Sequence, residues 1–232
     1  MKLPEAARHL LAFERGDLTG RLAALEAAFR GCGVESARPL CEENGIAPDL
    51  LHAAFAFKVV AGQINVLIHG IGILTALPYI LKGGEEIQEL SLGAGNTGRP
   101  FDLETTHRVA EFKFINWRGG AESIRQNSLF KDFFRLAEAD TTKVRELYLL
   151  ELDRPLRFLN GRRALASVLS RDEALRRDFT NRYGSRFAVA RDYYNHRREL
   201  VSLIDITRLV PAFVAFLQLP GAGQESGDEA TS

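Results

Sequence analysis

The strongest constraint on the fold of this chain is the stretch NTGRPFDLETTHRVAEFKFINW, which runs from Asn96 to Trp117. Its apolar and polar residues alternate, and this alternation predicts β-strands because successive side chains of a strand point to opposite faces. As a hypothesis, we centre the turn between the strands on Thr106 and His107. The pattern therefore predicts two short antiparallel strands joined by a turn at this pair.

The position of the turn also predicts which residues face each other. Glu104 would face Val109, and Asp102 would fall directly opposite Glu111. Opposite residues in an antiparallel pair point to the same face, with Cβ atoms about 5 Å apart. Lys113 lies two residues after Glu111 and shares that face. The hairpin therefore brings two carboxylates and one ammonium group together.

This grouping of charges suggests a metal site. Two neighbouring carboxylates repel each other unless a cation lies between them, and Mg²⁺ or Mn²⁺ prefers such oxygen ligands. Lys113 would orient an attacking water or stabilise the charge on a phosphate. Alternatively, Glu111 and Lys113 are solvated residues on the wet face of a sheet, with Phe112 and Phe114 on the buried face.

At these residues the chain resembles the PD-(D/E)xK nuclease superfamily, whose fold is restriction-endonuclease-like. The resemblance runs from Leu51 to about Glu151 and consists of an apolar helix, three strands, a helix and a further strand. Asp102 matches the aspartate of the family motif, and Glu111 and Lys113 match its acid-x-lysine element. The literal Pro-Asp pair is absent, because Phe101 precedes the aspartate.

The resemblance implies roles for several residues. Asp102 and Glu111 would bind Mg²⁺ or Mn²⁺ together with the carbonyl of Phe112, and Lys113 would assist the water. Gln126 would be catalytic as well, because some members carry a glutamine on the corresponding helix. The glutamate that many members carry on the first helix is replaced by polar residues, namely Gln63, Asn65 and His69. We interpret His69 as a buried core histidine.

The fold class expected from these patterns is α/β, with a restriction-endonuclease-like mixed sheet flanked by helices and with helical additions at both ends. Strands are predicted at 86–92 and 144–152, and a helix at 121–139. We divide the chain into an N-terminal helical extension (1–48), a nuclease-like core (49–160), an arginine-rich helical region packed on the core (161–219) and a disordered tail (220–232).

Arginine is concentrated after residue 154, where tyrosine and phenylalanine are interleaved with it. Guanidinium groups suit phosphates, so such a surface would supply a local positive field in a chain whose formal net charge is zero. The alternative is a solvated helix surface paired with acidic residues. The residues predicted to bind nucleic acid, most plausibly DNA, are Asn96, Arg99, Arg125, Arg162 and Arg163.

Composition bounds the remaining possibilities. The two cysteines, Cys32 and Cys41, have no metal-ligand spacing, and the N-terminus lacks a signal-peptide pattern, so a cytoplasmic protein is expected. The apolar run from Val59 to Leu81 contains polar residues, glycines and a proline, and predicts a buried helix with no membrane partner. The apolar segment Val201 to Leu219 would dock on the core or form a homodimer contact.

Two other functions remain open. The string from Gly93 to Gly98 has the pattern GxGxxG, which in some enzymes binds nucleotides or S-adenosylmethionine. That motif requires a helix to follow, whereas the residues after it alternate as strands do. The nuclease-like fold could also serve as a non-catalytic binding or assembly module, an interpretation favoured by the missing helix glutamate.

Overall fold

The computed structural model describes residues 2–14, 18–30, 32–93, 100–115, 117 and 122–214. The chain divides into two compact units, Met1–Asn65 and Val66–Ser232, and the division falls within one long helix. The first unit contains helices α1 (Leu3–Glu14), α2 (Leu18–Phe29) and α3 (Val34–Glu43) and the beginning of α4 (Pro48–Ile80). The sequence-based division began the core at residue 49, close to the start of this helix.

The second unit is built on a five-stranded mixed sheet in the order β1-β2-β3-β4-β5. The strands are β1 (Ile87–Leu90), β2 (Leu103–Thr105), β3 (Arg108–Lys113), β4 (Val144–Leu149) and β5 (Ser202–Asp205). β1, β2 and β3 are antiparallel neighbours, whereas β3, β4 and β5 run parallel to each other. The mixed α/β class predicted from the sequence is therefore confirmed.

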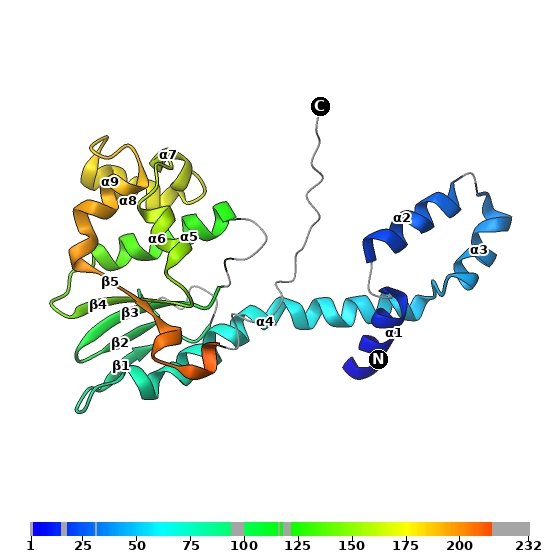
Figure 1. The fold of residues 1–232 in the computed structure, drawn as a ribbon, viewed down its shortest axis with the longest axis horizontal. Helices are drawn as coiled ribbons and strands as arrows, with labels where there is room; N and C mark the ends of the chain where they lie inside the picture. The colour runs from blue at the N-terminus through cyan, green and yellow to red at the C-terminus, as the bar shows by residue number, and fades with distance from the viewer. Residues whose placement is uncertain are drawn as a thin grey trace. The chain divides into compact units, whose positions relative to one another are not determined.

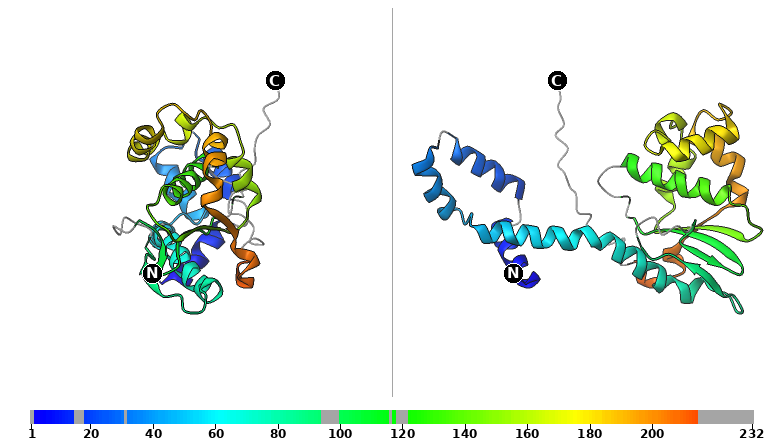
Figure 2. Two further views of the ribbon diagram at one scale, coloured as in Figure 1. Left: turned by 90° about the vertical axis from the view of Figure 1, so that its left-hand side faces the viewer. Right: turned by 180° about the vertical axis from the view of Figure 1, so that it is seen from behind.

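Helices cover both faces of this sheet (Figures 1 and 2). The part of α4 after residue 65 lies on one face, while α5 and the helices that follow β4 lie on the other. The helices on the second face are α5 (Glu122–Ala137), α6 (Asp153–Leu159), α7 (Leu165–Val168), α8 (Glu173–Tyr183) and α9 (Ala190–Arg197). This arrangement makes two hydrophobic cores, because side chains alternate between the two faces of each strand.

Each core has its own aromatic centre. On the α4 side, Phe112 stacks on Tyr148 with ring centroids 4.8 Å apart. On the α5 side, Phe134 and Phe179 pack with centroids 5.5 Å apart, and Tyr193 lies against both. The rings of Phe112 and Phe134 are almost completely buried. Burial of such large apolar surfaces is the main favourable contribution to folding.

A glycine lets α4 approach the sheet closely. A Cβ atom at Gly72 would lie 2.6 Å from the ring of Phe114, a distance that packed atoms do not adopt. The Phe114 ring is itself held between Phe112, at a centroid distance of 5.9 Å, and Phe213, at 5.2 Å. The helix therefore lies directly against the aromatic face of β3, and this brings His69 to the end of that strand.

The hairpin formed by β2 and β3 has the predicted register. Glu104 pairs with Val109 and Leu103 pairs with Ala110, so the next opposed pair is Asp102 with Glu111. Thr106 and His107 form the turn, although they are not a preferred hairpin pair. The chain after residue 99 therefore continues into a hairpin and not into the helix that a nucleotide-binding glycine motif requires.

The buried hydroxyl of Thr105 holds the turn. Its Oγ1 accepts hydrogen bonds from the backbone N–H groups of Arg108 at 2.9 Å and His107 at 3.0 Å, and donates to Glu85 Oε1 at 2.6 Å. The side chain thus satisfies two backbone donors that the turn itself leaves open. These hydrogen bonds to the Thr105 hydroxyl stabilise a turn that lacks the glycine usually found in two-residue hairpins.

The guanidinium of Arg108, at the start of β3, binds both β4 and the segment that precedes β1. It donates to Glu85 from Nε at 2.6 Å and from Nη2 at 2.7 Å, and to Glu146 and the Tyr148 hydroxyl from Nη1 at 2.7 and 2.8 Å. Arg108 is 2% exposed, so these are buried charges. Such a pair is stable only when its hydrogen bonds are complete, and this network fulfils that condition.

The C-terminal region differs from the sequence-based expectation in one respect. The segment 161–219 was expected to be entirely helical, but Ser202–Asp205 forms β5 and extends the sheet beside β4. The residues SLID are too few to show a period in the sequence, and the open edge of β4 provides the backbone partners that make them a strand. Helices α7, α8 and α9 contribute buried side chains to the core on the α5 side of the sheet.

The helix α4 is long and apolar enough to cross a membrane, with a window of mean hydropathy 1.6. This observation concerns length and composition only, and helices in the cores of soluble proteins meet the same criterion. Ile73, Ala76 and Ile80 of this helix are buried in the core of the second unit. Val59, Leu67, Ile71 and Leu74 of the same run are exposed, so the helix predicted to be buried is buried at only some of its positions.

We expect the replacement Thr105→Val to lower the free energy of unfolding by about 1–3 kcal/mol. Valine has nearly the same shape but leaves the N–H groups of His107 and Arg108 without their acceptor, and an unsatisfied buried donor costs this amount. Urea denaturation measures the change. A control variant, Thr180→Val, alters an exposed hydroxyl outside the hairpin. Equal stability of Thr105→Val and the parent would contradict the assigned role of the hydroxyl.

The Glu85–Arg108 pair should also make stability depend on acid pH. Burial acts to raise the pKa of Glu85, but the hydrogen bonds from Arg108 and Thr105 outweigh it and lower that pKa from 4.5 to about 2. Because the folded pKa is depressed, the stabilisation is complete above pH 4.5 and is lost as the pH falls toward 2. Urea midpoints measured across this range should fall in the parent and fall less steeply in Glu85→Gln.

Candidate active site

The end of the β2–β3 hairpin brings the predicted acids together. The Oδ2 atom of Asp102 accepts a hydrogen bond from the backbone N–H of Phe112 at 2.9 Å, and the Asp102 and Glu111 side chains are hydrogen-bonded to each other. Asp102 lies just before β2 begins, so its carboxylate takes a backbone donor that the strand does not reach. The register predicted from the sequence therefore produces this contact.

His69 of α4 also belongs to this group. Its Nε2 lies 3.2 Å from Oδ1 of Asp102, and its ring contacts Phe114 edge-on at a centroid distance of 6.3 Å. The sequence-based interpretation of His69 as a core histidine is thus incomplete, because its side chain is one-fifth exposed and faces the aspartate. Its position within the long apolar run from Val59 to Leu81 gave no sign of this contact, which depends on the packing of α4 against β3.

Lys113 makes an ion pair with Asp132 of α5. Asp132 is 5% exposed, whereas one-fifth of the Lys113 side chain is exposed. The sequence analysis missed Asp132, although an acid among Phe130, Phe133 and Phe134 on the buried side of a helix was a detectable signal. The ammonium predicted to face the acids therefore has a dedicated partner on the covering helix.

The closeness of the carboxyl groups of Asp102, Glu111 and Asp132 shifts the pKa values of the site. Burial and the neighbouring charges of Asp132 and Asp102 raise the pKa of Glu111 far above its usual range, so this carboxyl holds a proton near neutral pH. Burial also acts to raise the pKa of Asp102, but the bonds from His69 and Phe112 lower it below its usual range. Asp102 is therefore anionic beside a protonated acid.

Lys113 remains the cation of the group. Burial acts to lower its pKa, but the charge and the hydrogen bond of Asp132 outweigh this effect and raise it. The site thus holds more carboxyl groups than its single ammonium can neutralise, and the proton on Glu111 compensates. A proton held between two buried carboxyls occupies a position that another cation could take.

Gln126, predicted to be catalytic, belongs to a different group of contacts. Its amide donates to Oε1 of Glu122 at 2.9 Å and accepts a hydrogen bond from Arg163. It lines a cavity of about 560 Å³ with Arg162 and Arg163, two of the residues predicted to bind nucleic acid. Arg125 is half-buried on the same helix. The structure therefore groups Gln126 with the arginines and not with the hydrogen-bonded acids.

The remaining predicted contacts with nucleic acid cannot be placed. Asn96 and Arg99, and most of the glycine loop between Gly93 and Gly98, lie outside the described residues. The Phe112 carbonyl, proposed from the sequence as a metal ligand, belongs to β3 next to the Asp102 hydrogen bond. Its role as a ligand stays a prediction.

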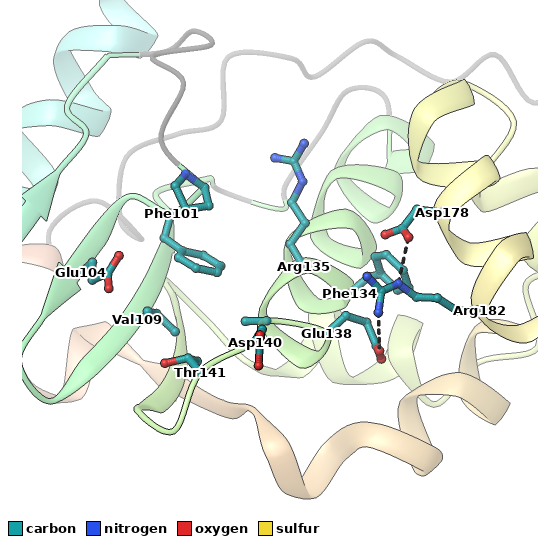
Figure 3. A pocket seen from close by; sticks show the side chains of 12 residues that line it. Phe101, Glu104, Val109, Phe134, Arg135, Glu138, Asp140, Thr141, Asp178 and Arg182 are labelled. Atoms are coloured by element: carbon teal, nitrogen blue, oxygen red, sulfur yellow. Dashed lines mark hydrogen bonds and ion pairs between the residues drawn. The ribbon is translucent and has the colours of Figure 1, made fainter.

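A second cavity, of about 610 Å³, begins one residue before Asp102 (Figure 3). Phe101 and Glu104 border it on the β2 side, while Glu138, which directly follows α5, and Arg182 of α8 lie across from them. Arg182 pairs there with Glu138 at 3.6 Å and with Asp178 at 2.8 Å. The cavity lies over the same face of the sheet as Glu111, because Val109 lines it and strand residues alternate.

Within the described part of the chain, no cluster of three or more histidine, cysteine, aspartate or glutamate side chains is arranged as a preformed metal site. Asp102 and Glu111 together offer a two-carboxylate site, with His69 beside Asp102. Mg²⁺ is commonly held by one or two carboxylates, with waters completing its coordination. The donor set at the hairpin therefore has the oxygen chemistry that this ion prefers.

Comparisons of the chain with protein-family models, with curated proteins and with solved structures found no significant match. The residues of the site and their geometry therefore carry the functional argument.

The Lys113–Asp132 pair can be tested through stability. Lys113→Met should cost about 3 kcal/mol, because it leaves Asp132 charged and buried without its cation. Adding Asp132→Asn should recover most of this loss, since the uncompensated charge is then removed. Urea denaturation of both single variants and the double variant measures the coupling. Purely additive effects would show that the two side chains do not depend on each other.

Proposed function

We propose that this protein is a metal-dependent nuclease that hydrolyses phosphodiester bonds in DNA, acting as an endonuclease in defence or repair. The observation that carries the proposal is the grouping of Asp102, Glu111 and Lys113 at the end of one hairpin, with Asp102 and Glu111 hydrogen-bonded to each other. Their positions match the acid and acid-x-lysine spacing of the PD-(D/E)xK resemblance.

The cofactor would be Mg²⁺ or Mn²⁺. The high pKa of Glu111 fits this choice, because burial beside Asp132 and Asp102 makes a second negative charge unfavourable unless a cation balances it. The carboxylates of Asp102 and Glu111 would hold the ion, with the Phe112 carbonyl as a third ligand. Such an ion, when bound, lowers the pKa of a coordinated water and offsets charge on the phosphate.

The protein's own side chains then have distinct tasks. Lys113, which remains protonated and one-fifth exposed, would donate to a phosphate oxygen or orient the water. Asp132 would position the Lys113 ammonium, and His69 would orient the carboxylate of Asp102 through their 3.2 Å contact. These supporting contacts matter because catalysis requires groups that are already in place before the substrate binds.

The order of elements also supports the proposal. Helix α4, three strands, helix α5 and strand β4 follow one another in the order expected from the resemblance to restriction-endonuclease-like proteins. The acids lie at the β2–β3 hairpin, as that resemblance implies. The fold at this finer level remains part of the proposal.

The substrate is inferred from the surroundings of the acids. The cavity next to Asp102 is lined by the aromatic ring of Phe101 and by Arg135, whose side chain is exposed (Figure 3). Aromatic rings stack on bases and guanidinium groups bind phosphates. A nucleotide next to the cleaved bond could enter this cavity, which favours nucleic acid over a small phosphoester.

One observation favours a second candidate, a non-catalytic binding or assembly module. Lys113 already pairs with Asp132, and the Asp102 and Glu111 side chains already bond to each other. A closed network of this kind could also serve only to hold the hairpin against α5. The two candidates differ in whether the acids bind a divalent ion.

Metal binding should depend on the acid pair. Isothermal titration calorimetry with Mn²⁺ should give one specific site in the parent and none in Asp102→Ala/Glu111→Ala, because removing both carboxylates removes the proposed oxygen ligands. Glu104→Gln serves as the matched control, since Glu104 lies on β2 but pairs with Lys143 at 2.7 Å. Absence of binding in the parent, with and without DNA, would support the non-catalytic module.

Cleavage provides the second part of this test. With Mg²⁺ and supercoiled DNA, Asp102→Ala should reduce the cleavage rate at least about 100-fold, and so should the Lys113→Met/Asp132→Asn variant, which avoids an unpaired buried charge. Far-ultraviolet circular dichroism checks that each variant remains folded. Cleavage by all variants at the parental rate would show that the site assignment is wrong.

A further inference from the structure

The cavity lined by Gln126 is surrounded by guanidinium groups. It has a volume of about 560 Å³ and lies where the start of α5 meets α6 and the loop that follows α6. Its arginines are Arg154, Arg157, Arg162 and Arg163. Among the residues that line it, Glu122 is the one acid. Four cations around one concave surface form an unusual concentration of positive charge in a chain with no net charge.

The loop that carries two of these arginines is held by its backbone. The N–H of Gly161 donates to the Phe158 carbonyl at 2.8 Å, and a Cβ atom at Gly161 would lie 2.9 Å from the same oxygen. On the other side, the N–H of Ala190 donates to the Arg163 carbonyl at 2.9 Å. The loop is thus attached to both α6 and α9, so its arginines project from a fixed support.

Glu122 offsets only part of the positive charge of the cavity. Glu122 accepts a hydrogen bond from Gln126, and Arg163 donates to the oxygen of the same glutamine. The ion pairs found among the described residues do not include Arg154, Arg157 or Arg162. The cavity therefore offers several guanidinium groups without a carboxylate partner.

Crowding of like charges is visible at one of the arginines. Burial and the nearby charge of Arg171 lower the pKa of Arg163 from its usual value. Like-charged neighbours are tolerated on a surface when an anion can bind between them. The lining places forked guanidinium donors from α6 and from the following loop around one cavity, and such donors suit the three oxygens of a phosphate.

We propose that this cavity binds a phosphomonoester dianion, and, building on the proposed nuclease function, that its natural source is the terminal phosphate of a DNA strand. A terminal phosphate carries about −1.5 to −2 charges near pH 7, compared with −1 for a diester. It also presents three free oxygens, one more than a diester. Its charge therefore balances the surplus guanidinium groups better than an internal phosphate does.

The test is an equilibrium binding experiment that needs no cleavage. Fluorescence anisotropy in EDTA would compare a short labelled duplex ending in a phosphate with the same duplex ending in hydroxyl groups. The parent should bind the phosphorylated duplex at least about ten-fold more tightly. Arg157→Gln/Arg162→Gln should lose this preference, while Arg176→Gln/Arg177→Gln, which removes two exposed charges from α8, should retain it.

The outcomes separate the alternatives. Equal binding of both duplexes by the parent would overturn the proposal. An equal loss of affinity for both duplexes in Arg157→Gln/Arg162→Gln would also overturn it, because these arginines would then bind internal phosphates. Competition by deoxyadenosine monophosphate at the affinity of the duplex end would support the monoester site but identify a free nucleotide as its source. Asp102→Ala/Glu111→Ala should keep the preference, so failure of the nuclease assignment would be seen separately.

Discussion

The rest of the second unit depends on the register between β2 and β3. The Thr105 hydroxyl holds the turn by accepting hydrogen bonds from two backbone N–H groups, and Arg108 ties the start of β3 to Glu85 and Glu146. A slip of one residue would turn every side chain of the hairpin to the opposite face. Asp102 would then lose Glu111, and the aromatic residues of β3 would leave their core.

The same register determines the charge balance of the site. On one face of β3 the aromatic side chains make a dry core against α4, and on the other face Glu111 and Lys113 meet α5. This face is too buried for its acids to be independently solvated, so each carboxyl depends on a neighbour. Asp132 neutralises Lys113, while a proton on Glu111 limits repulsion with Asp102. Under the proposed function, a bound metal ion would take over the role of this proton.

The helices on the α5 side of the sheet contribute positively charged residues to the surface of the second unit. They bring arginines from a region far along the chain to the start of α5, where the cavity with Gln126 forms. Negative charge is thus gathered at the hairpin and positive charge at the junction of α5 and α6. Under the two proposals, a chain whose formal charges cancel would present separate regions for a metal and for phosphates.

Local sequence alone determined the hairpin, its turn and the pairing of Asp102 with Glu111, because these depend on alternation and on residues close together in the chain. The class of the fold followed from the order of such local patterns. Only the tertiary structure decided the roles of His69 and Asp132, which reach the site through the packing of α4 and α5 on opposite faces. It likewise decided that the residues of β5 form a strand, because their hydrogen-bond partners lie on β4, more than fifty residues earlier.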